Sequence, residues 1–407
     1  MKFVSKIFFV GLIFCLIFSL SLSCFAAENG VYEKFLDNNG GLISVSHRGD
    51  TSLYPENSLE AIVSAKNKGA DLISVSVQRS KDGVFFLVEN GFLSGECKTE
   101  AASCSELSSE EIKSLLHYNL DGSVSSCRVA TLKEAVDALG GEAVLIADNC
   151  FEYFDEIESF CRENNAFSKV ILRTDSGSKK VFEKLSQKKT ELQVISIYSG
   201  AIIWNTHLNL SRMAEASQAA VQFQSKNYFN VCYGSFTADK FSSGNNPRAV
   251  APMFNKDLCG QREDNVSGWN ELISKGFSVV ETNCIEELEA YISQCESGLL
   301  KLSQLIETAK TVNTGLYSSG SEEAFTDALK KAEKVFENKN SSLGEIQQAN
   351  SLLIETMKNL TFGEHKDDQR GTLNITAGKI AAVVVFGGLI LAGEIYVYKK
   401  QKSKLCK

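Results

Sequence analysis

The strongest constraint on this chain is an alternation of short apolar runs with amphipathic stretches, which continues from residue 42 to about residue 295. The apolar runs have the length of strands, and the stretches between them carry apolar residues at helical spacing. Strands that alternate with helices predict a parallel sheet, because each helix provides the crossover to the next strand. The predicted strands are Leu42–Ser46, Leu72–Val77, Ala143–Ala147, Val170–Arg173, Gln193–Ile197, Ala219–Gln222, Ala249–Phe254 and Ser278–Glu281.

Eight such units over about 250 residues fit a (β/α)8 TIM barrel. An open, doubly wound sheet is the alternative, although no GxGxxG dinucleotide motif follows the first strand. We assign residues 28–296 to this domain. The predicted helices between the strands are Leu59–Lys68, Leu132–Ala138, Phe154–Glu163, Lys180–Ser186 and Trp269–Ser274.

The hydrophobic period changes between residues 297 and 362. Three stripes at i, i+3, i+4 and i+7 spacing follow one another and are separated by polar clusters such as "NKNSS". This pattern predicts a small three-helix bundle. The polar stretch after it, which begins "GEHKDDQRG", predicts a linker over residues 363–379.

The two ends of the sequence predict export and a membrane anchor. Lysines followed by an apolar run and small residues predict a signal peptide over residues 1–27, with an uncleaved anchor or a lipoprotein at Cys24 as alternatives. Residues 380–398 form an apolar run broken by Glu394, and lysines follow it. This run predicts a transmembrane helix with a cytoplasmic tail at 399–407 and the large domain outside the cell membrane.

The composition bears on whether the protein binds nucleic acid and whether it can form disulfides. The net charge of −8 and the absence of a basic stripe argue against nucleic acid as a partner. Of the 12 cysteines, Cys15, Cys24 and Cys406 lie in the predicted ends, which leaves 12 − 3 = 9 in the exported part. Disulfides are compatible with export, and Cys97 with Cys104 is the plausible pair by proximity.

A His-Arg pair follows the first predicted strand. The carboxyl ends of barrel strands are where chemistry occurs in this fold, so His47 and Arg48 are expected at the active mouth. Arginine binds phosphate oxygens and histidine transfers protons, which suits an anionic substrate. Of the other histidines, His117 and His365 are interpreted as surface residues and His207 as a structural one.

The segment around this pair resembles the glycerophosphodiester phosphodiesterase family. The shared motifs are His47-Arg48-Gly49, Pro55-Glu56-Asn57, Gly69-Ala70-Asp71 and Lys81-Asp82-Gly83, with weaker matches at "ATLKEAV", "LIADN" and "GWNELISKGFSVVETN". The resemblance covers residues 42–295. It implies a TIM barrel of the phospholipase-C-like phosphodiesterase type, and metal-dependent cleavage of a glycerophosphodiester by two histidines.

The resemblance also implies roles for particular residues. His47 matches the first catalytic histidine, and Arg48 the phosphate clamp. Glu56 and Asn57 fall in the substrate-binding motif, and Glu56 and Asp148 are the carboxylates left for a metal site. The cofactor implied is a divalent cation, Ca2+ or Mg2+, for which oxygen ligands are required.

Three positions depart from the family pattern. Ser74 and Ser76 stand where the family has Glu-x-Asp, and Glu89-Asn90 replaces the second His-Asp. A hydroxyl is a poor substitute for a carboxylate on a hard cation, and Glu89 would act as a catalytic acid only with a raised pKa. The favoured interpretation is a barrel that has lost catalysis and binds a phosphate-bearing or polyol ligand. The alternative is an active phosphoric diester hydrolase of lipid metabolism with an altered metal site.

The helical segment has a resemblance of its own. Residues 302–360 resemble the FIVAR module of bacterial surface proteins, through Tyr317-Ser318, the "ALKKAEKVFEN" stretch and the final "MKNL". This resemblance implies a spacer or a module that contacts cell-wall carbohydrate.

Overall fold

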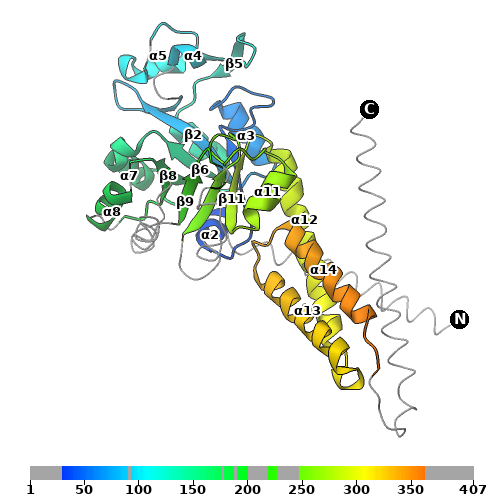
Figure 1. The fold of residues 1–407 in the computed structure, drawn as a ribbon. Coiled ribbons are helices and arrows are strands. Elements are labelled where there is room, and N and C mark those ends of the chain that lie inside the picture. The colour runs from blue at the N-terminus through cyan, green and yellow to red at the C-terminus, as the bar shows by residue number, and fades with distance from the viewer. Residues whose placement is uncertain are drawn as a thin grey trace, which may run out of the picture. The chain divides into compact units, whose positions relative to one another are not determined.

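The computed structural model describes residues 30–362, except 90–92, 102, 177, 188–189, 200–218, 228 and 230–246 (Figure 1). The described residues form two compact units, which divide between Ile292 and Ser293. The predicted signal peptide, linker, transmembrane helix and tail lie outside the described residues, as do His207 and His365. Among the residues that are described, no helix is long and apolar enough to cross a membrane.

The first unit is a closed barrel of eight parallel strands. Its strand order is β1-β11-β10-β9-β8-β7-β6-β2, and β2 pairs back onto β1. Closure excludes the open, doubly wound sheet and confirms the predicted TIM barrel. All eight predicted strands are present, with ends that differ by at most two residues. They are β1 (Ile43–His47), β2 (Leu72–Arg79), β6 (Val144–Asp148), β7 (Val170–Thr174), β8 (Val194–Ser199), β9 (Ala220–Gln224), β10 (Arg248–Pro252) and β11 (Phe277–Thr282).

Several helices that cover the barrel begin at a capping residue. The Ser58 hydroxyl accepts a hydrogen bond from the Ala61 backbone, and Thr131 forms a capping box with Glu134. Their apolar faces pack with the outer faces of the strands in one buried cluster. Outside the segment between β2 and α6, the helices of the barrel are α2 (Val31–Leu36), α3 (Leu59–Asn67), α6 (Leu132–Leu139), α7 (Phe154–Glu163), α8 (Ser178–Gln187) and α11 (Val266–Ile273), with a short 3-10 turn at Phe151–Tyr153.

The amino-terminal end of the barrel is closed by α2 (Figure 1). Phe35 of this helix joins the apolar residues inside the barrel, such as Val45, Ile146 and Val279. The buried Arg248 guanidinium donates to the backbone carbonyls of Lys34, Asp37 and Gly41 and so ties α2 to the strands. This end of the barrel is therefore filled by apolar side chains and by α2.

The segment between β2 and α6 contains an inserted subdomain that the sequence pattern did not reveal. Its elements are β3 (Phe85–Leu87), α4 (Leu93–Glu96), the 3-10 turn Cys104–Glu106, α5 (Ser109–Lys113), β4 (Leu116–Tyr118) and β5 (Val124–Arg128). Strand β3 pairs antiparallel with β2, and β4 pairs with β5. Each element has at most five residues, which is too short for a hydrophobic period to be recognised.

The subdomain corrects two interpretations. His117 is not a surface residue: it is 1% exposed, and burial lowers its pKa to about 4. Cys97 and Cys104 are not joined, since both are buried free thiols of the subdomain core. Burial disfavours the charged thiolate and raises the pKa of each to about 12. The predicted disulfide is therefore wrong in this structure.

The second unit contains α12 (Ile285–Lys310) from Ser293 onward, together with α13 (Ser319–Glu337), α14 (Leu343–Lys358) and a 3-10 turn at Thr314–Leu316. The carboxyl-terminal part of α12 shares one buried apolar cluster with α13 and α14, built around Leu302, Phe325 and Leu353. A capping box between Ser342 and Glu345 begins α14. The resemblance to the FIVAR module stays a prediction.

Candidate functional site

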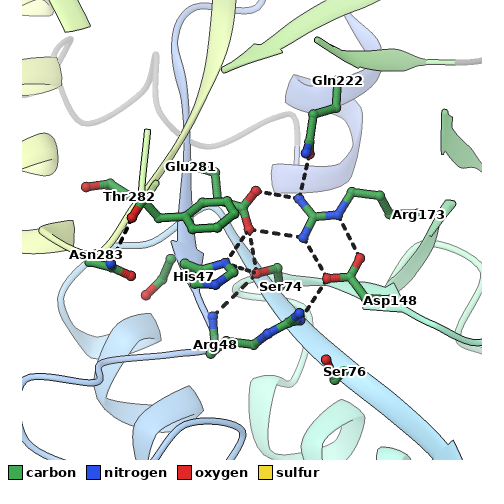
Figure 2. Close-up of polar contacts among 12 residues, drawn as sticks. His47, Arg48, Ser74, Ser76, Asp148, Arg173, Gln222, Glu281, Thr282 and Asn283 are labelled. Carbon is green, nitrogen blue, oxygen red and sulfur yellow. Dashed lines mark hydrogen bonds and ion pairs between the residues drawn. The ribbon is translucent and has the colours of Figure 1, made fainter. Parts of the chain in front are cut away.

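Polar side chains fill the inside of the barrel at its carboxyl end. Successive residues of a strand point to opposite faces, so residues two apart share the inward face. Each strand that contributes to the site has apolar inward residues first and a polar one near its end, as in Ile43, Val45 and His47 of β1. The same alternation brings Ser74, Asp148, Arg173, Gln222 and Glu281 together (Figure 2).

His47 is fixed by a carboxylate and an aromatic ring. Its Nδ1 lies 2.9 Å from Glu281 Oε1, and its ring stacks on Phe254 with centroids 3.6 Å apart. Glu281 is fully buried; burial alone would raise its pKa, yet the charge of Arg173 and the contact with His47 hold that pKa well below its usual range. An ionised carboxylate only accepts hydrogen bonds, so Nδ1 carries the proton and Nε2 is the unprotonated nitrogen of neutral His47.

Arg48 lies in a left-handed turn, with φ of 60°, directly after β1. Its backbone N donates to Ser74 O at 3.0 Å, which ties the turn to the neighbouring strand. The guanidinium Nη1 donates to Asp148 Oδ2 at 2.7 Å, and Nη2 lies 3.3 Å from Glu89 Oε2. The predicted phosphate clamp is thus at the mouth, and its guanidinium already pairs with two carboxylates.

The two serines lie on the inward face of the barrel with His47 and Asp148. Ser74 Oγ donates to Glu281 Oε1 at 2.6 Å, and Ser76 Oγ donates to Glu89 Oε2 at 2.6 Å. Both hydroxyl protons are therefore donated to carboxylates, and the two serines bring no negative charge to the mouth.

Glu56 and Asn57 lie in the loop between β1 and α3. Asn57 is fully buried, and its side-chain oxygen accepts from Ser76 N at 2.9 Å, so its amide holds the loop against β2. Glu56 is exposed, and its charge contributes to the pKa of Glu96. Burial is the main cause that raises the pKa of Glu96 to about 7, with the charges of Glu89 and Glu56 adding to it.

Three residues at the centre of the site were not predicted from the sequence: Arg173, Gln222 and Glu281. Arg173 donates through Nε to Asp148 Oδ1 at 2.7 Å and through Nη2 to Asp148 Oδ2 at 2.6 Å. Its Nη1 donates to Gln222 Oε1 at 2.8 Å and to Glu281 Oε2, and Nη2 also reaches Glu281 Oε1 at 3.1 Å. The sequence signal that could have found Arg173 and Glu281 is a charged residue at the end of an apolar strand. Such a position is buried, and buried charges are rare unless they are paired.

The last strand is held at its end by Asp264. This carboxylate accepts from Thr282 Oγ1 at 2.8 Å, from Asn283 N at 2.9 Å and from the Trp269 indole at 2.8 Å. The bonds from Thr282 and Asn283 fix the backbone next to Glu281. The position of Glu281 under His47 therefore depends on the loop before α11 as well as on the strand.

The residues of the site do not fit the divalent cation that the resemblance implies. A hard cation requires oxygen atoms that are free to accept, and both oxygens of Asp148 already accept from arginines. The described residues contain no group of three or more His, Cys, Asp or Glu side chains that could hold a metal ion. Of the two predicted ligands, Asp148 is bound by Arg48 and Arg173, and Glu56 is exposed in the loop between β1 and α3. This geometry therefore supports no reaction step through a metal.

Comparison with known proteins agrees with the fold. Residues 47–231 match the sequence model of the Glycerophosphoryl diester phosphodiesterase family. Glycerophosphodiester phosphodiesterase GDPD4 of Arabidopsis thaliana is 34% identical over 92 residues, which make up 22% of this chain and 28% of that protein. The alignment thus spans less than a third of that relative.

A glycerophosphoryl diester phosphodiesterase from Parabacteroides distasonis has a similar crystal structure. Its TM-score is 0.52 at 16% sequence identity, and the match covers 65% of this chain and 92% of that one. The likeness shows a shared fold. Residues 47–231 thus match the sequence model of the glycerophosphoryl diester phosphodiesterase family, and the barrel shares its fold with a crystal structure of that name.

Proposed function

We propose that the barrel is a member of this family that binds a ligand without hydrolysing it. The observation that carries the proposal is the series of contacts Ser76–Glu89–Arg48–Asp148, in which groups at the family's catalytic positions bind one another. Glu89 occupies the position of the second histidine and accepts from Ser76. The loss of one of two proton-transfer groups costs about 10²–10⁴ in rate, and the loss of a metal removes charge stabilisation as well.

The ligand is a small molecule with a phosphate or a polyol group. Glu89 is the most exposed carboxylate around Arg48, with 36% of its side chain accessible, so it is the partner that a ligand can displace. An anionic ligand would then meet the Arg48 guanidinium, with His47 Nε2 as a second polar group. Arginine is suited to phosphate because its planar fork binds two oxygens at once.

The test is titration calorimetry of the purified full-length protein with sn-glycerol 3-phosphate and with glycerol. Glu89→Gln keeps the shape of the side chain but removes the charge that competes for Arg48. We expect this variant to bind sn-glycerol 3-phosphate about 3–10-fold more tightly, because a partly exposed pair contributes roughly 1 kcal/mol. Glycerol, which has no charge, should bind both proteins equally.

Glu110→Gln is the matched control, since Glu110 is an exposed glutamate that pairs with Lys113 at 3.5 Å, outside the contacts of the mouth. It should leave binding unchanged. Glycerophosphocholine should be stable in the presence of the wild-type protein with Ca2+ or Mg2+. Metal-dependent turnover would establish the hydrolase alternative, and the absence of binding by either compound would end the proposal.

We further propose that the protein is exported and tethered to the cell membrane, with the barrel outside and the helical unit as a spacer or a contact for cell-wall carbohydrate. The support is the pattern of the two sequence ends: small residues after an apolar run at one end, and lysines after another run at the other. Protease treatment of intact cells should release a fragment that contains the barrel. A barrel that stays protected until the cells are lysed would contradict this topology.

A further inference from the structure

Arg173 lies at the centre of the barrel mouth, and its side chain is 4% exposed. An arginine side chain has five N–H donors in a rigid fork. Each has an oxygen partner here: two on Asp148, two on Glu281 and one on Gln222 (Figure 2). No donor is left for a ligand, so Arg173 is directed wholly at the protein.

The partners of Arg173 are the kind of ligands that a hard divalent cation would use. They are carboxylate and amide oxygens, which converge on one point from β6, β9 and β11. Ser74 Oγ lies beside them, because it shares Glu281 Oε1 with the guanidinium. The charge of this oxygen set is neutralised by one buried guanidinium instead of a metal.

We propose that Arg173 is a resident cation: it takes the place of the divalent ion and makes the mouth of this barrel independent of metal. Two buried carboxylates that face each other would otherwise repel and lose solvation. A guanidinium stays protonated in proteins, so the positive charge between these carboxylates is permanent. This inference rests on the contacts of Arg173 and holds whether or not the mouth binds a ligand.

The experiment replaces Arg173 with methionine, which has a similar length and no charge. Arg173→Met leaves Asp148 and Glu281 without their shared partner and opens a set of oxygens to an external cation. Thermal unfolding of the full-length proteins is followed by the fluorescence of buried Trp269 in α11, with Ca2+ or with NaCl of equal ionic strength. We expect Ca2+ to raise the Tm of the variant by about 3 °C or more in a saturable way, and the wild-type Tm to stay constant.

Arg248→Met is the matched control. Arg248 is also buried, at 1% exposure, but it donates to backbone carbonyls at the opposite end of the barrel. Its loss should lower the Tm, and Ca2+ should not restore it, because no buried carboxylate pair is released.

Because Arg173→Met is expected to be destabilised, it is also refolded from denaturant with and without Ca2+, where recovery only with Ca2+ supports the proposal. Three results would overturn it. They are stabilisation of the wild type by Ca2+, equal rescue of Arg248→Met, and failure of Arg173→Met to respond to Ca2+ in both unfolding and refolding.

Discussion

Glu281→Gln is expected to lower the free energy of unfolding of the barrel by about 3–5 kcal/mol, the range for removing one partner of a buried ion pair. Glu281 is fully buried and contacts Arg173, His47 and Ser74. Glutamine keeps the size of the side chain, so the loss reports the charge and not a cavity. Urea unfolding at pH 7 measures the effect, followed through Trp269 fluorescence.

The same variant tests the dependence on pH. The pKa of Glu281 is lowered in the folded state, so its contribution is present above the ordinary glutamate pKa of about 4.3 and is lost as pH falls through the folded value. The difference between wild type and Glu281→Gln should therefore shrink as the pH is lowered below about 4.3. A difference that stays constant down to about pH 2 would contradict the ion pair as its cause.

Glu142→Gln is the control for the charge change. Glu142 pairs with Lys66 at 3.4 Å, but its side chain is 74% exposed. Exposed pairs contribute about 0–1 kcal/mol, so this variant should unfold close to the wild type. An equal loss in both variants would show that the buried network has no special role.

Gly49→Ala is expected to cost about 3 kcal/mol, from left-handed strain of about 1 kcal/mol together with overpacking. Gly49 has φ of +87°, and a Cβ at this position would lie 2.7 Å from the carbonyl carbon of Ala61 and 2.8 Å from its Cβ. The backbone of α3 cannot move away without shifting the loop that carries Arg48. Chemical unfolding followed by Trp269 fluorescence measures the loss.

Gly122→Ala separates the two causes. Gly122 also has a positive φ, +80°, but nothing lies within 4 Å of the position that the added methyl group would occupy. This variant should show the strain alone, about 1 kcal/mol. If Gly49→Ala lowers the free energy of unfolding no more than Gly122→Ala does, then close packing of the His-Arg-Gly turn against α3 is not the reason for glycine at position 49.

Local patterns in the amino-acid sequence were enough to predict the barrel and one side of its mouth. Period-2 and period-3.6 patterns arise from local geometry, so the strand ending at His47 and the helix beginning at Leu59 could be predicted from neighbouring residues. The motif at Arg48 and Gly49 was also local. The strands that carry Ser74 and Asp148 were predicted from short apolar runs in the same way.

The elements of the inserted subdomain could not be predicted in this way. Strands such as Leu116–Tyr118 are held by a partner strand and by a shared apolar cluster, and they have no period of their own. The free thiols of Cys97 and Cys104 show the same limit, because closeness in sequence did not bring the two cysteines into a disulfide.

The balance of charges in the site is a property of the folded barrel. Asp148 and Arg173 come from neighbouring strands, Glu281 lies more than a hundred residues further along the chain, and the three meet because the sheet closes into a barrel. In the sequence, Asp148 could be taken for a metal ligand and Arg48 for a free clamp. In the folded barrel, both oxygens of Asp148 bind arginines, since a buried carboxylate must find a positive partner nearby. Which positive group is near enough depends on distances in the folded structure, and the order of residues does not give these distances.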